Sequence, residues 1–103
     1  DKTLSAFLED IPKAYSTPEI RIPCAEEDKN LYVEKAKKHF QSKNYETICV
    51  DGVRFRFKDG WGLVRASNTG PELIVRCEAT TKENLKEIQN EINKSLSPLL
   101  VKY

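Results

Sequence analysis

Residues 60–79 read GWGLVRASNTGPELIVRCEA, two apolar runs separated by a polar loop. Short apolar runs bounded by Gly, Pro, Asn and Ser are typical of buried strands joined by a turn. We therefore predict strands over residues 61–66 and 73–79, with the loop 67–71 between them. The other elements can be placed outward from this hairpin.

Two further strand segments precede the hairpin. Apolar alternation over residues 20–24 predicts a strand near the edge of a sheet, since Pro23 has no amide to donate to a neighbouring strand. A second strand region, residues 47–58, is interrupted by the turn signal Asp51-Gly52. Together with the hairpin, these segments predict four strands.

Amphipathic helices are expected between and after the strands. Residues 28–43 carry their apolar side chains on one helical face, and so does the final helix, which ends near residue 96. Thr80 and Glu83 have the spacing of a capping box at the start of that final helix. A short entering helix is expected over residues 4–11.

The order of these elements predicts an α+β fold, a single antiparallel four-stranded sheet with helices packed on one face. The length of 103 residues fits one domain, residues 1–103, and is sufficient for one hydrophobic core. Residues 97–103 are expected to be a frayed tail. A chain that starts at Asp1 and contains no methionine suits a part of a longer protein.

The composition argues against several classes of function. Seventeen basic and 16 acidic residues give a net charge of +1, whereas a general nucleic-acid or membrane-surface binder needs a basic face. No apolar stretch approaches the roughly 20 residues that span a bilayer. Cys24, Cys49 and Cys77 lie far apart in apolar contexts, so we expect three reduced core cysteines, no zinc site and a cytoplasmic location.

Hydrogen-bond donors are concentrated at the tip of the hairpin. Arg65 can grip two phosphate oxygens, and Ser67 and Thr69 offer hydroxyls. Asn68 tolerates positive φ, which would let successive backbone amides converge on an anion, with further amide contacts around Ala66. Charge-assisted bonds of this kind contribute about 1.5 to 3 kcal/mol each. We predict a site for a dianion, although from composition alone an ordinary turn is the more common explanation.

The run from Gly60 to Pro71, followed by Val-Arg-Cys-Glu-Ala at residues 75–79, resembles the C-terminal domain of the α-D-phosphohexomutases. The segments 16–20 and 51–53 match as well, and the similarity covers about residues 4 to 96. Within that family, the Arg-Ala-Ser-Asn-Thr form is similar to the bacterial phosphomannomutase/phosphoglucomutase branch. A long continuous match of this kind is more specific than an isolated glycine motif.

The resemblance implies a TATA-box-binding-protein-like fold and a role in phosphate binding. It implies that the phosphate which is not being transferred binds at the hairpin tip, at residues Arg65, Ala66, Ser67, Asn68 and Thr69. The family interconverts hexose 1-phosphates and hexose 6-phosphates, so hexose phosphates are the expected ligands.

The rest of the family's machinery is not found in this sequence. Its phosphoserine, metal and sugar loops belong to N-terminal domains, which are the expected partners of this chain. Magnesium and a hexose 1,6-bisphosphate activator are implied for the whole enzyme, while no metal, cofactor or catalytic residue is expected here. We therefore expect this chain to be inactive by itself.

A small RNA-binding module is the alternative function. An open sheet with Tyr45, Phe55 and Phe57 as stacking platforms would suit a small module that binds single-stranded RNA, but the net charge is low for that task. His39 is expected to be exposed and without function. Trp61 is expected to cover apolar neighbours rather than stack on a sugar.

Overall fold

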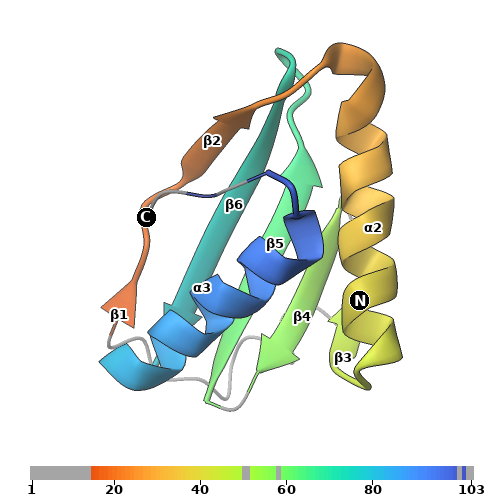
Figure 1. Cartoon of the computed structure of the whole chain (residues 1–103). Coiled ribbons are helices and arrows are strands. Elements are labelled where there is room, and N and C mark those ends of the chain that lie inside the picture. Colours follow the sequence, from red (N-terminus) through yellow and green to blue (C-terminus); the bar gives the residue numbers. More distant parts are fainter. Residues whose placement is uncertain (1–14, 50–51, 58, 100, 102–103) are drawn as a thin grey trace.

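The computed structural model describes residues 15–49, 52–57, 59–99 and 101. Helices α2 and α3 lie together over one face of an antiparallel sheet (Figure 1). The strands are β1 (Tyr15–Ser16), β2 (Ile20–Pro23), β3 (Glu46–Ile48), β4 (Val53–Phe57), β5 (Gly60–Ala66) and β6 (Glu72–Ala79). Their order across the sheet is β1-β6-β5-β4-β3, and β2 also pairs with β6.

The α+β fold with an antiparallel sheet and helices on one face is confirmed, with six strands in the described part of the chain where four were expected. Strands β1 and β2 pair with successive parts of β6, so they form one interrupted edge. The predicted strand region 47–58 is divided near Gly52 into β3 and β4, which pair with each other. The hairpin of β5 and β6 lies at the centre, where seven residue pairs join the two strands.

The helices begin where local signals place them, with one shift. A single 3-10 turn, η1 (Glu26–Asp28), leads into α2 (Lys29–Ser42), and α3 (Lys82–Leu96) ends the fold. The predicted capping box at Thr80 is wrong by one residue. Thr81 caps α3, and its hydroxyl accepts a hydrogen bond from the amide of Asn84 at 3.1 Å.

The main core fills the space between the helices and the sheet. Phe40 of α2 stacks on Phe55 of β4, with ring centroids 3.6 Å apart. Gly62 makes this possible because a Cβ there would lie 2.5 Å from the Phe55 ring. Tyr45 and Phe57 pack against the same core. The rings that would have served as RNA-stacking platforms are thus core side chains, and the RNA-binding alternative is not supported.

The opposite face of the sheet holds a second, smaller apolar cluster. Trp61 and Leu63 are buried there, at 5% and 3% exposed. The indole of Trp61 donates a hydrogen bond to the buried Glu78 carboxylate at 3.1 Å. Trp61 therefore covers apolar neighbours, as expected, and its polar edge is satisfied.

The three cysteines differ in burial, contrary to the expectation that all are core residues. Cys77 is fully buried, and burial raises the pKa of its thiol to about 12. Cys24 is partly buried, and Cys49 is exposed because it follows the short edge strand β3. All three are free thiols.

Two predicted segments lie at the ends of the chain. The entering helix expected over residues 4–11 lies outside the described residues. Within the expected frayed tail 97–103, Val101 is 3% exposed and its amide donates to the side chain of Asn93, so this residue is packed. None of the described helices combines the length and apolar composition that a membrane-spanning helix needs.

Candidate functional site

The β5–β6 loop, residues 67–71, lies at the end of the sheet where α2 begins (Figure 1). The loop is closed by its own hydrogen bonds. The Ser67 amide donates to the Glu72 carbonyl at 2.9 Å, and the Glu72 amide donates to the Gly70 carbonyl at 2.9 Å. A further backbone bond, from Cys24 to the Pro71 carbonyl at 2.9 Å, ties the loop to the end of β2.

Two hydroxyls meet inside the loop. Ser67 is 2% exposed, and its Oγ accepts from the Thr69 amide at 3.1 Å. The same oxygen lies 3.2 Å from Thr69 Oγ1, and either hydroxyl can be the donor. A bridge between two hydroxyls uses one of their two protons. The pair can therefore still donate the second proton to a ligand oxygen.

The expected convergence of backbone amides is wrong. Among the described non-glycine residues, positive φ occurs only at Asn44 (64°) and Asp59 (54°), and therefore not at Asn68. The amides of Ser67 and Thr69 are already bonded within the loop. An anion-binding nest needs successive free amides with alternating backbone handedness, and the Ser67 and Thr69 amides do not provide it.

Arg65 is the penultimate residue of β5, directly before the loop. Val64 and Gly62 contact the main core, so strand alternation places Arg65 on the face away from the helices. Gly52 lies against it, and a Cβ at Gly52 would be 2.4 Å from the Cβ of Arg65. Gly52 also has a φ of +112°, which favours glycine. The half-buried Arg65 thus depends on a glycine that its own sequence neighbours do not reveal.

Asn68 of the loop borders a surface hollow, which we call the loop hollow. Its volume is about 160 Å³, and it is lined by Asn30, Val33, Gly52, Ala66 and Asn68. The structure brings two of the predicted site residues, Ala66 and Asn68, to this hollow, while the first turns of α2 form its other wall.

Lys29 is a residue of this region that sequence reasoning missed. Its Nζ donates to the Ser67 carbonyl at 2.7 Å and to the Gly70 carbonyl at 3.2 Å. It also pairs with Glu26 at 2.9 Å, and its side chain is only 12% exposed. A lysine at the start of a charged helix is usually solvated. The two loop carbonyls that Lys29 binds lie about 40 residues away along the chain, so no local signal identifies it.

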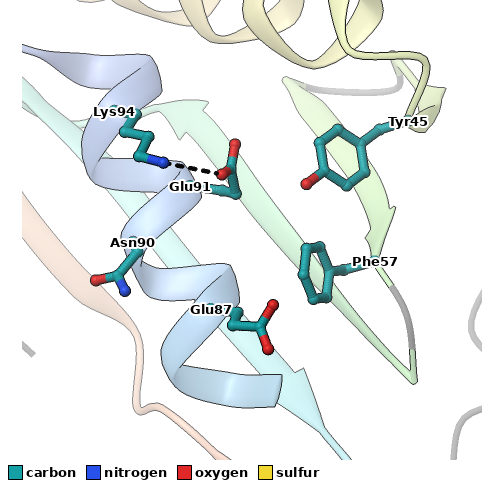
Figure 2. A pocket seen from close by; sticks show the side chains of 6 residues that line it. All are labelled: Tyr45, Phe57, Glu87, Asn90, Glu91 and Lys94. Atoms are coloured by element: carbon teal, nitrogen blue, oxygen red, sulfur yellow. Dashed lines mark ion pairs between the residues drawn. The ribbon is translucent and has the colours of Figure 1, made fainter. Parts of the chain in front are cut away.

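A second hollow, which we call the helix hollow, lies at the other end of β5, where Phe57 pairs with Gly60. Its volume is about 230 Å³. Figure 2 shows its lining side chains, which are Tyr45, Phe57, Glu87, Asn90, Glu91 and Lys94.

Glu91 is the centre of a charged cluster beside the helix hollow. One of its oxygens lies 3.1 Å from His39 Nε2 and 3.3 Å from Lys43 Nζ, and the other lies 3.5 Å from Lys94 Nζ. Burial acts to raise the pKa of Glu91, but the hydrogen bonds to His39 and Lys43 outweigh it and lower that pKa. His39 is therefore a partly buried structural partner and not the exposed residue that was expected.

The comparison with known families agrees with the geometry of the hairpin. Residues 19–95 match the family described as phosphoglucomutase/phosphomannomutase, C-terminal domain. The chain belongs to this family. Members of the family are phosphomutases, so the chain is part of an isomerase family.

Individual relatives support this assignment. The chain is 41% identical over 96 residues to a phosphomannomutase/phosphoglucomutase from Pseudomonas aeruginosa, covering 93% of this chain and 20% of the relative. It is 42% identical over 90 residues to a phosphoglucomutase from Neisseria meningitidis serogroup B, covering 84% and 19%.

A solved structure shares the fold. A phosphoglucomutase/phosphomannomutase family protein from Burkholderia thailandensis superimposes with a TM-score of 0.72 at 30% identity, covering 96% of this chain and 21% of that one. The chain thus spans about a fifth of the length of these relatives.

The described residues near the loop offer little for a metal ion. Within the described ranges, no group of three or more His, Cys, Asp or Glu side chains could hold a metal ion. Among the acids near the loop, Glu26 pairs with Lys29, and Glu72 pairs with Arg21 at 3.1 Å. The chemistry available at this end of the domain is therefore hydrogen-bond donation and positive charge.

Proposed function

We propose that this chain is the substrate-phosphate-binding domain of an enzyme that interconverts hexose 1-phosphates and hexose 6-phosphates. In this proposal, Arg65, Ser67, Asn68 and Thr69, with the backbone around Ala66, hold the phosphate that is not being transferred. The observation that carries it is the Ser67–Thr69 hydroxyl pair, ordered within the loop that directly follows Arg65. Family membership and the names of the relatives support the substrate class.

Each side chain has a chemical task in this proposal. The guanidinium of Arg65 supplies positive charge and can bind two phosphate oxygens. The hydroxyl pair donates its remaining proton, and the exposed Asn68 side chain contributes amide donors. Such contacts recognise the phosphate and not the sugar. This suits an enzyme that must bind the phosphate group whether it is at position 1 or at position 6 of the hexose.

The domain's contribution would be binding and orientation. A firmly held far phosphate fixes the distance and direction of the reacting one, which is a large part of the rate advantage of an enzyme. We place the serine nucleophile, the magnesium ion and the sugar contacts in the N-terminal parts of the larger enzyme. The three free thiols support a cytoplasmic location, because a reducing compartment keeps thiols free.

An NMR titration of the chain tests this proposal. Glucose 6-phosphate, mannose 1-phosphate and inorganic phosphate should each shift the amides of residues 66–70 and leave those around the helix hollow unchanged. Because one domain supplies only part of the substrate site, we expect a Kd in the millimolar range, about 4 kcal/mol or less of binding free energy.

Two arginine variants make the titration specific. Arg65→Ala should abolish the shifts. Arg76→Ala is the matched control, because it removes the same charge from the neighbouring strand β6, where Arg76 is exposed and opposite Leu63. Loss of binding in both variants would indicate a general charge effect, and no shifts at tens of millimolar ligand in the unmodified chain would refute the proposed function.

A further inference from the structure

We propose that Lys29 is a positioning residue for phosphate binding, holding the β5–β6 loop in the conformation that presents its donors to the ligand. Lys29 comes from the first turn of α2, far along the chain from the β5–β6 loop. The inference rests on the proposed function of the loop. It assigns to Lys29 no direct contact with substrate.

The geometry shows how the lysine acts. An ammonium group has three N–H donors and accepts nothing. Lys29 donates hydrogen bonds to the Ser67 carbonyl (2.7 Å) and to the Gly70 carbonyl (3.2 Å), and its ammonium forms an ion pair with the Glu26 carboxylate at 2.9 Å. With two loop carbonyls bound and its side chain only 12% exposed, Lys29 supports the loop from the α2 side.

The two carbonyls that Lys29 binds bracket the ligand-facing residues. Between Ser67 and Gly70 lie only Asn68 and Thr69, so both ends of this dipeptide are held from the helix side. Carbonyl oxygens repel an anion because they carry partial negative charge. By engaging them, Lys29 keeps the oxygens turned toward α2 and leaves the hydroxyl pair and the Asn68 amide to face the ligand.

Position, and not charge, is the main contribution of Lys29. Its ammonium is paired with Glu26 at 2.9 Å, and this counter-charge opposes its field at the loop. Its bonds also join the loop to α2, whose residues Asn30 and Val33 line the loop hollow. Lys29 therefore sets both the loop conformation and the width of the hollow beside it.

Substitution of Lys29 by methionine, Lys29→Met, tests this role. We expect phosphate and glucose 6-phosphate to bind about tenfold more weakly, since small misplacements of binding groups are costly. In the absence of ligand, the amide shifts of residues 66–70 should change, while those of β4 and α3 should not. Lys29→Arg, which can donate to both carbonyls, should recover part of the affinity.

Two control variants separate position from charge and from general stability. Lys35→Met removes a lysine of the same helix that donates to the Ser97 carbonyl, away from the loop, and should leave phosphate affinity unchanged. Glu26→Gln removes the counter-charge while leaving the lysine bonds to the loop, and should change affinity less than twofold. A large gain in affinity for Glu26→Gln would show that the field matters more than position and would overturn the inference.

The outcomes distinguish this inference from the proposed function. If the unmodified chain binds phosphate and Lys29→Met binds it equally well, the role of Lys29 is refuted while the function of the loop stands. If the unmodified chain shows no shifts in the loop, both are refuted. Should Lys29→Met fail to fold, Lys29→Ala, which removes both lysine bonds to the loop and favours the helix, decides the question, because equal binding by that variant refutes the role.

Discussion

The two hollows at opposite ends of β5 are built from similar parts but differ in charge. Each lies between a helix and the sheet, and the larger is the helix hollow, at about 230 Å³ against 160 Å³ for the loop hollow. The helix hollow carries two carboxylates, Glu87 and Glu91. Burial and these two carboxylates raise the pKa of the neighbouring Tyr45.

The described residues that line the loop hollow carry no charge. The carboxylates near the loop, Glu26 and Glu72, are paired with Lys29 and Arg21, and Lys29 also binds two carbonyl oxygens of the loop. Hydroxyl and amide donors remain for a ligand. The two hollows thus differ in the distribution of donors and paired charges as well as in volume, and the proposed function depends on that distribution.

The largest effect that we expect comes from Gly52→Ala, which attacks the support of Arg65. The new Cβ would lie 2.4 Å from Arg65 Cβ and 2.6 Å from the Val64 carbonyl, at a φ of +112°. The free energy of unfolding, measured by urea denaturation, should fall by roughly 3 kcal/mol. Gly70→Ala is the matched control within the loop, since its Cβ would meet nothing closer than 3.7 Å. Equal stability of the two variants would contradict this account of Gly52.

The second effect concerns the whole enzyme. In a full-length phosphomannomutase/phosphoglucomutase carrying this domain, Arg65→Ala should reduce kcat/KM by roughly 100-fold, because a loosely held far phosphate misplaces the reacting one. Lys94→Ala removes a cation from the helix hollow and should change kcat/KM less than twofold. Unchanged steady-state kinetics of Arg65→Ala would show that Arg65 does not bind substrate. Substitutions at the loop and at the helix hollow would then have the same effect on kcat/KM.

The smallest effect is a pH dependence at the helix hollow. The hydrogen bonds of Glu91 with His39 and Lys43 outweigh burial and place its folded-state pKa below the ordinary 4.5. Its stabilising contribution is therefore complete above pH 4.5 and is lost as the pH falls through the folded-state pKa. Glu91→Gln should remove this contribution, which we expect to be less than about 1 kcal/mol.

Thermal unfolding as a function of pH measures the contribution of Glu91 to stability. The difference in Tm between the unmodified chain and Glu91→Gln should be greatest near neutral pH and should shrink below pH 4.5. Phosphate binding at the loop should be the same in both proteins. A difference in Tm that grows on acidification would mean that the Glu91 pairs do not stabilise the fold.

Local patterns in the sequence were sufficient for much of this fold. The apolar runs on either side of the β5–β6 loop predicted the central hairpin, and helical periodicity predicted α2 and α3, because these signals depend on neighbouring residues. The family resemblance of residues 60–79 predicted a phosphate site at the loop. The cap of α3 was displaced by one residue because Thr80 and Thr81 are both suitable capping residues.

Features that join distant segments were not accessible in the same way. The interrupted edge of β1 and β2 could not be read from alternation, since it depends on how both strands meet β6. The burial of His39 beside Glu91 and the exposure of Cys49 are also set by packing between elements. A residue's type states which environments it tolerates, but its neighbours in space determine which one it has.

The amino-acid order thus specifies the elements, the hairpin and the set of donors at its tip, because helix and strand periods and turn chemistry are local properties. The tertiary structure determines the environment and contacts of each residue. It brings Lys29 to carbonyls about 40 residues away, sets Gly52 against Arg65 and keeps Asn68 out of positive φ. These outcomes depend on the packing of α2 and β4 against β5, which no short stretch of sequence encodes.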